Sequence, residues 1–98
     1  MPVSYIYSYV DSLLRASQES AQNSELASKQ GHTLEASAFA FAALAYLQSA
    51  ISIAPKRVQS ILPNAQEMIQ QLNNLPSSQL KGKLGPLTDI KSKQPELQ

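Results

Sequence analysis

Hydrophobic and small side chains follow a helical period through the first third of the chain, from residue 4 to residue 29. They recur at intervals of three and four as Ile6, Tyr9, Val10, Leu13, Leu14, Ser17, Ser20, Ala21, Ser24 and Ala27. This spacing predicts one long amphipathic helix whose buried stripe changes from large apolar residues to small ones. Buried serines need hydrogen-bond partners, which are often the carbonyl groups one turn back. Gly31 then stands where a left-handed residue ends a helix.

The next segment predicts a second helix, from Thr33 as a good N-cap to Ala54, the residue before Pro55. One of its faces carries Ala36, Phe39, Ala40, Ala43, Leu47, Ala50 and Ile51. The opposite face carries Leu34, Ala38, Phe41, Ala45 and Ser52. Because both faces are apolar, we expect a central helix with a neighbour on each flank.

This second helix is also the segment to test for membrane insertion. Between Ala36 and Leu47 only Ser37 is polar, but that run has twelve residues, and a span needs about twenty. Much of the run is alanine, and the lysines typical of an interfacial helix are absent. The pattern therefore favours a buried core helix over a membrane span.

A third apolar stripe lies between Pro55 and Leu75, with Gln and Asn on the other face. Its members are Val58, Ile61, Leu62, Ala65, Met68, Ile69, Leu72 and Leu75. Pro63 interrupts it, so either a single helix kinks there or a short turn at 56–62 precedes a helix with Pro63 at its first position. Together the three segments predict an all-α fold, an antiparallel three-helix bundle over residues 1–75.

Composition changes after residue 75, where proline, glycine and lysine become frequent. We expect residues 76–98 to be a flexible tail or linker. The alternative is a docking peptide, because Leu80, Leu84, Leu87 and Ile90 supply apolar anchors.

The overall composition excludes several classes of function. The chain of 98 residues has a net charge of +1 and 15% charged residues, which does not indicate a nucleic-acid surface or a strong attraction to anionic lipid. It has no cysteine, so it contains no disulfide, thiolate metal ligand or thiol nucleophile. The N-terminus lacks the basic region and cleavage site of a secretory signal, which is compatible with a cytoplasmic location.

No arrangement of residues in the sequence indicates catalysis. His32, the only histidine, is expected to be an exposed loop residue, and the seven carboxylates are scattered. Glycine-rich phosphate loops are absent, and the Lys56–Arg57 pair is expected to serve surface solubility. We therefore predict a protein that is not an enzyme and that holds no cofactor and no metal.

The second helix carries a recognisable spacing. Gly31 is followed by Glu35–Ala36, then by Ala43, Tyr46–Leu47 and Ala50–Ile51, which resembles the second helix of microtubule-interacting-and-trafficking (MIT) domains. The chain departs from that family at Ala40, which replaces an aromatic residue, and at Ser28, which replaces an acidic one. The resemblance covers residues 10–54 and is weak in the third helix.

Tetratricopeptide repeats share the glycine-to-alanine spacing but end their second helix earlier. Their proline would fall near Gln48, whereas here it is Pro55. A single repeat also could not bury its own core. The longer second helix therefore favours the MIT-like module.

The MIT resemblance implies a monomeric cytoplasmic adaptor that holds short peptide segments of ESCRT-III-like proteins in a groove between helices. It would act in protein transport and be recruited to endosomal membranes through a partner, without inserting into the membrane itself. The groove would be lined by Leu44, Gln48, Ile51, Ala65, Met68, Ile69 and Leu72. The alternative is a self-associating helical bundle with an assembly role, a homodimer that buries the Pro55–Leu75 stripe.

Overall fold

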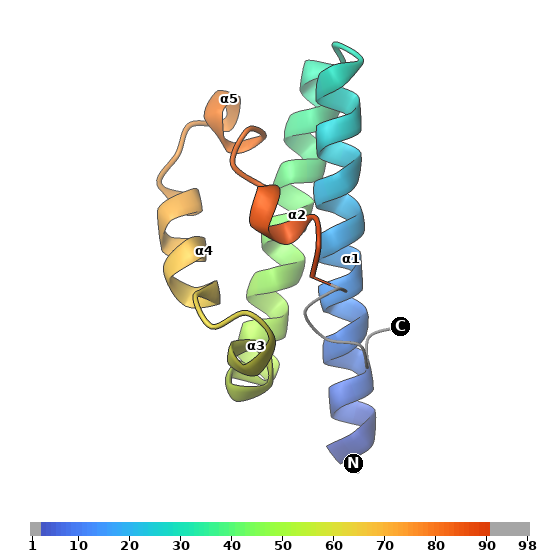
Figure 1. Cartoon of the computed structure of the whole chain (residues 1–98), viewed down its shortest axis with the longest axis vertical. Helices are drawn as coiled ribbons and strands as arrows, with labels where there is room; N and C mark the ends of the chain where they lie inside the picture. The colour runs from blue at the N-terminus through green and yellow to red at the C-terminus, as the bar shows by residue number, and fades with distance from the viewer. Residues whose placement is uncertain (1–2, 91–98) are drawn as a thin grey trace.

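The computed structural model describes residues 3–90, and every regular element in that range is a helix, as the sequence predicts. The elements are α1 (Val3–Lys29), α2 (Thr33–Ile53), α3 (Pro55–Ile61), α4 (Ala65–Asn73), α5 (Ser77–Leu80) and the 3-10 turn η1 (Gly85–Leu87). The two long helices α1 and α2 form an antiparallel hairpin, and the shorter elements pack beside it (Figure 1).

A tight turn joins the two long helices. Gly31 has a φ of 79°, and its N–H donates to the Ser28 carbonyl at 3.1 Å, while the His32 N–H donates to Ala27 at 2.9 Å. These two bonds form a Schellman motif and confirm the role predicted for Gly31. The expectation that Thr33 caps α2 is wrong. His32 is the N-cap and makes no side-chain capping bond, because the turn is so short that Thr33 already belongs to the helix.

Buried serines hold α1 against α2. The Ser17 hydroxyl donates to the Ala43 carbonyl at 2.7 Å, and the Ser24 hydroxyl donates to the Ala36 carbonyl at 2.6 Å. Both serines therefore bond to the neighbouring helix rather than to a carbonyl one turn back on α1, where we expected their partners. The two pairs are seven residues apart on each helix, which is two helical turns. Small side chains at these positions let the two backbones approach closely.

The second face of α2 lies open to solvent in the described chain. Leu34 is 86% exposed and Phe41 is 54% exposed, and Ala38, Ala45 and Ser52 are exposed as well. The expectation that this face is covered is therefore wrong for the described chain. The helix α2 does have neighbours on two flanks, with α1 on one side and α4 and α5 on the other (Figure 1), but they leave this face exposed. Among residues 3–90, α2 alone has the length and hydropathy of a membrane-crossing helix, a property that core helices of soluble proteins share.

The third segment is divided into α3 and α4. Ala54, the residue before Pro55, leaves the helical region with φ −145° and ψ 75°, so the chain breaks after α2 and starts again as α3. Pro63 lies in the turn at 62–64, so it neither kinks a continuous helix nor opens α4. Apolar residues of both helices join the core formed with α2: Val58, Ile61, Leu62, Ala65, Ile69 and Leu72.

Because these side chains are buried within the chain, the Pro55–Leu75 stripe does not offer the dimer interface that we considered from the sequence.

The segment from residue 76 to residue 90 is part of the core. Leu80, Leu84, Leu87 and Ile90 are each at most 1% exposed. The Gln22 amide also donates to the Thr88 carbonyl at 2.9 Å, which ties this segment to α1. The expected flexible tail is therefore wrong for residues 76–90, since prolines and glycines shorten the helices here without preventing burial of the leucines. Residues 91–98 of that expectation lie outside the described range.

One ion pair joins α1 to α3. Arg57 donates to both oxygens of the Asp11 carboxylate, at 3.2 Å through Nε and 2.8 Å through Nη2. Both side chains are largely buried, and the Arg57 guanidinium lies 5.0 Å from the centre of the Tyr7 ring. Our prediction that Arg57 is a surface residue is therefore wrong, whereas its neighbour Lys56 is exposed.

We expect Arg57→Ala to destabilise the protein by about 1–3 kcal/mol, because the buried Asp11 carboxylate would lose its bidentate partner. Urea unfolding followed by circular dichroism measures this effect. Lys56→Ala is the matched control and should leave the transition unchanged. An equal, small effect of both substitutions would mean that the ion pair contributes nothing to holding α3.

Candidate binding groove

A groove runs between α2 and α4 on the described surface. Its walls are formed by Gln48, Ile51 and Ser52 from α2 and by Gln66, Ile69 and Gln70 from α4. The volume is about 500 Å³, and the groove is open to solvent along its length. We call this set of six residues the α2–α4 groove. It exists because the turn at 62–64 reverses the chain and lays α4 alongside α2 (Figure 1).

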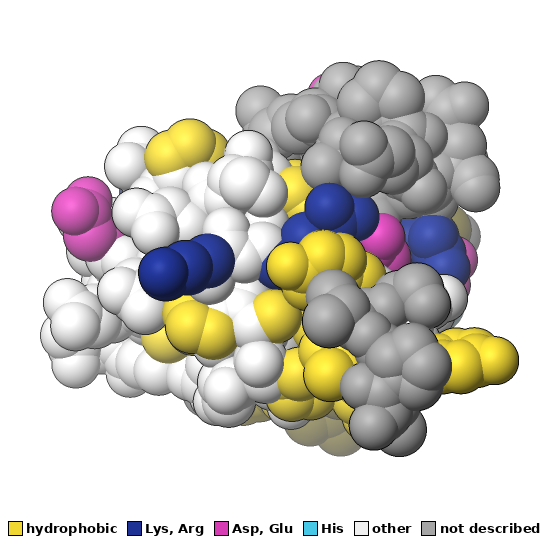
Figure 2. Space-filling model, turned by 90° about the horizontal axis from the view of Figure 1, so that it is seen from below, with side chains coloured by type: hydrophobic (Ala, Val, Ile, Leu, Met, Phe, Trp, Pro, Cys, Tyr) yellow, Lys and Arg dark blue, Asp and Glu magenta, His cyan; other side chains and the backbone are white. Residues whose placement is uncertain are grey.

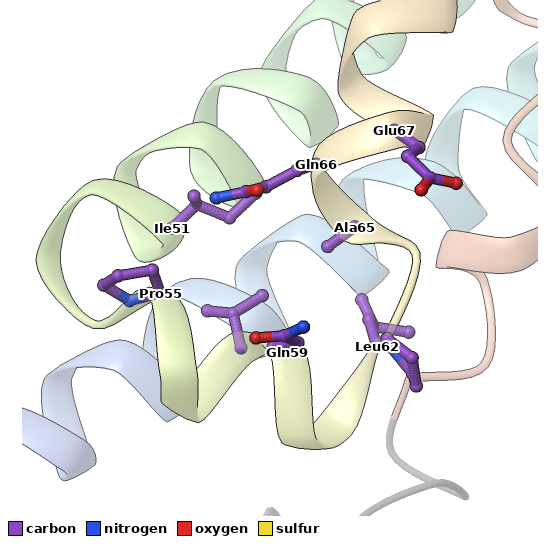
Figure 3. A pocket seen from close by; sticks show the side chains of 9 residues that line it. Ile51, Pro55, Gln59, Leu62, Ala65, Gln66 and Glu67 are labelled. Carbon is purple, nitrogen blue, oxygen red and sulfur yellow. The ribbon is translucent and has the colours of Figure 1, made fainter.

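At the end next to α3 the groove continues into a smaller pit of about 120 Å³. The pit shares Ile51 and Gln66 with the groove, and Figure 3 shows Gln66 extending from α4 toward Ile51. Its lining consists of Ile51, Pro55, Val58, Gln59, Leu62, Pro63, Ala65, Gln66 and Glu67. Cavities of roughly 150 Å³ admit a benzene molecule, so the pit is the size of one aliphatic side chain.

The chemistry of the groove is that of amides above an apolar floor. Ile51 and Ile69 are the apolar residues, and Gln48, Gln66 and Gln70 stand around them. Each glutamine can both donate and accept hydrogen bonds, as can the peptide groups of an extended chain. None of the six groove residues is charged, and Glu67 is the only ionisable side chain that lines the pit. The site therefore suits an uncharged extended segment with one apolar anchor.

In the view from the end that carries α3, basic, acidic and hydrophobic side chains are interspersed on the described surface (Figure 2). Because the six groove residues are themselves uncharged, direct charge pairing with a ligand would contribute little to binding within the groove.

The structure separates the seven residues that we predicted as one site. Gln48, Ile51 and Ile69 line the groove, and Ala65 lines the pit. Met68 and Leu72 lie on the other side of α4, in a hollow of about 330 Å³ that also involves Lys83 and Pro86.

Leu44 is 4% exposed, belongs to the core and lines none of these hollows. The predicted residues therefore do not form one continuous surface.

Sequence reasoning missed Gln66, Gln70 and Ser52. A signal was present, because Gln66 and Gln70 are four residues apart on α4 and therefore flank Ile69 on one face. We had assigned the glutamines of this segment to its solvent-facing side.

Within residues 3–90 the arrangement offers no metal centre. No group of three or more His, Asp or Glu side chains is close enough to hold an ion there. His32 and Glu35 come within 3.7 Å of each other, but both are exposed at the turn between α1 and α2, far along the hairpin from the groove.

No protein-family model matches this chain, and no curated protein or solved structure is significantly similar to it. Within residues 3–90 the protein is all-helical and has an open, uncharged groove between α2 and α4. The resemblance to MIT domains rests on the spacing of residues within 10–54 alone.

Proposed function

We propose that this chain is a non-catalytic protein-interaction module that holds a short segment of a partner protein in the α2–α4 groove. The observation that carries the proposal is the pairing of an apolar floor with amide side chains on both walls, ending in a pit of side-chain size. Such a site gives affinity through the backbone of an extended segment and specificity through one anchor residue.

The first partners to test are segments of ESCRT-III-like proteins. The MIT-like spacing of α2 motivates this choice, with α3 and α4 together taking the place of the third MIT helix. The module would then be cytoplasmic and would be recruited to endosomal membranes by its partner.

We expect the double substitution Gln66→Ala and Gln70→Ala to weaken binding of such a segment about tenfold, because two side-chain hydrogen bonds to its backbone are lost. Binding is measured by titrating a panel of ten-residue peptides, including ESCRT-III-type segments, into ¹⁵N-labelled protein and following amide shifts. Peptides with and without a central leucine test the pit.

Gln71→Ala is the matched control, since Gln71 is on α4 but lines the hollow with Met68 and Leu72. It should leave binding unchanged. Amide shifts centred on Met68 and Leu72, or an equal loss of affinity in the control, would move the site to the other side of α4. A panel that produces no shifts at all would refute the proposed function.

A further inference from the structure

The open face of α2 is a regular seam. Leu34, Ala38, Phe41, Ala45, Gln48 and Ser52 alternate at intervals of four and three residues, and all six are exposed. That is the heptad spacing by which one helix packs along another. We call these six residues the α2 seam. Within the described chain no helix covers it, although its two largest apolar side chains, Leu34 and Phe41, are 86% and 54% exposed.

We propose that the occupant of the α2 seam is a second copy of this chain, with the two α2 helices antiparallel about a two-fold axis. In that arrangement Leu34 lies opposite Ser52 of the other copy, Ala38 opposite Gln48, and Phe41 opposite Ala45. Each of these facing pairs then combines a large side chain with a small one, as close packing requires. A parallel pair would place Phe41 against Phe41. It would leave gaps where Ala38 faces Ala38 and where Ala45 faces Ala45.

A hollow beside the seam fits this pairing. It has a volume of about 500 Å³ and is lined by Tyr9, Ala45, Gln48, Ser49, Ser52 and Ile53. Leu34 of the second copy, which lies opposite Ser52, would enter it. Leu34 thus gains an apolar environment between Tyr9 and Ile53 that it does not have in the single chain.

Charge also favours an antiparallel pair. No residue from Ala36 to Ala54 is charged, so the two seams meet without repulsion. Glu35 is the only carboxylate of α2. A parallel pair would bring the two copies of Glu35 together, whereas the antiparallel pair separates them by about 24 Å along the axis. That separation exceeds the Debye length of about 8 Å at physiological ionic strength.

The contact area is small for a stable dimer. A strip about 30 Å long and about 20 Å wide corresponds to roughly 600 Å² on each copy. The total of roughly 1,200 Å² is at the lower limit for stable interfaces, so we expect a weak dimer that dissociates on dilution. The seam shares Gln48 and Ser52 with the α2–α4 groove, so a second copy and a bound segment would compete. This competition, unlike the dimer, rests on the proposed function.

Sedimentation equilibrium from 1 µM to 1 mM tests the dimer. We expect a monomer–dimer equilibrium that Phe41→Lys weakens at least tenfold and Phe41→Ala weakens less. Leu26→Lys is the matched control, because Leu26 is 55% exposed and lies on α1, outside the seam. It should leave the equilibrium unchanged. Circular dichroism and thermal unfolding of each variant, at concentrations where only monomer is present, verify that the fold is retained.

Cysteine cross-linking tests the orientation, and the chain has no native cysteine to interfere. A mixture of Ala38→Cys and Gln48→Cys chains should form a mixed disulfide on mild oxidation, while Ala38→Cys alone should not, since its copies lie about 15 Å apart along the axis. A disulfide between two Ala38→Cys chains would overturn the antiparallel arrangement.

A monomer at every concentration, or equal weakening by Phe41→Lys and Leu26→Lys, would overturn the dimer. Binding of the monomer to phosphatidylcholine vesicles would assign the seam to lipid instead. Peptide titration of the monomeric Phe41→Lys variant separates the two proposals, because its groove is intact whether or not the seam binds a second copy.

Discussion

A variant with both Leu84 and Leu87 replaced by alanine should lose most of its stability. Each leucine is at most 1% exposed, and truncating a buried leucine to alanine costs about 2–5 kcal/mol. The pair would therefore cost about 4–10 kcal/mol, against a total stability of about 5–15 kcal/mol for a typical domain. The double variant should unfold at much lower urea concentration than the native chain and should expose apolar surface that binds a hydrophobic dye.

Lys83→Ala is the matched control for this variant, because Lys83 belongs to the same segment but is exposed. It should unfold at the same urea concentration as the native chain. If the double variant also unfolded at the urea concentration of the native chain, residues 80–90 would not be part of the core. They would then be peripheral, as the composition of this segment suggests.

The misreading of residues 76–90 has a physical explanation. Proline and glycine limit the length of helices, and their frequency here correctly indicates that no long helix forms. They do not determine whether the intervening leucines are buried. Leu80, Leu84, Leu87 and Ile90 keep intervals of three and four residues, and this pattern was the signal for a core segment. The proline and glycine content of the segment favours the opposite interpretation, a flexible tail.

The long helices were predictable because each is set by local features. The turn at Gly31 and the break before Pro55 depend on backbone geometry that a few neighbouring residues determine, so their positions followed directly from the sequence. The partners of Ser17 and Ser24 did not follow, because which helix lies within hydrogen-bonding distance of a buried hydroxyl is a property of packing between distant segments.

The groove was predictable only in part for a related reason. The contact between α2 and α4 follows a line along both helices, and a periodic apolar pattern in the sequence identifies such a line. Three of the predicted residues lie on it: Gln48, Ile51 and Ile69. Met68 and Leu72 are one and three residues from Ile69, and the direction of α4 after the turn at 62–64 places them on its other side. No local pattern gives that direction, since it depends on how the turn packs.

The two apolar faces of α2 show a further limit of sequence patterns. Hydrophobicity on both sides indicates that both sides are to be covered, but it does not say by which chain. In the described chain α1, α3 and α4 pack against α2 and leave the face with the α2 seam exposed. The heptad spacing of the other face is the reason that we assign it to a second copy rather than to an absent segment of unspecified kind.

Ser17→Leu should destabilise the protein by about 3 kcal/mol, because Ser17 lies in the contact between α1 and α2. Its side chain is fully buried, and the hydroxyl is 2.7 Å from the Ala43 carbonyl oxygen. A larger side chain would force the helices apart, which costs about 1–3 kcal/mol, and the hydrogen bond would be lost at about 1 kcal/mol. Ser17→Ala removes only the bond and should cost about 1 kcal/mol.

The comparison between these two variants separates size from hydrogen bonding as the reason for serine at this position. Ser8→Leu supplies the matched control, since Ser8 is exposed on the same helix and should tolerate the larger side chain. Chemical unfolding of all three variants gives the free energies to compare. If Ser17→Ala proved as costly as Ser17→Leu, the hydrogen bond to Ala43 would account for most of the lost stability. The interpretation that small residues of α1 are needed for close approach of the two helices would then be wrong.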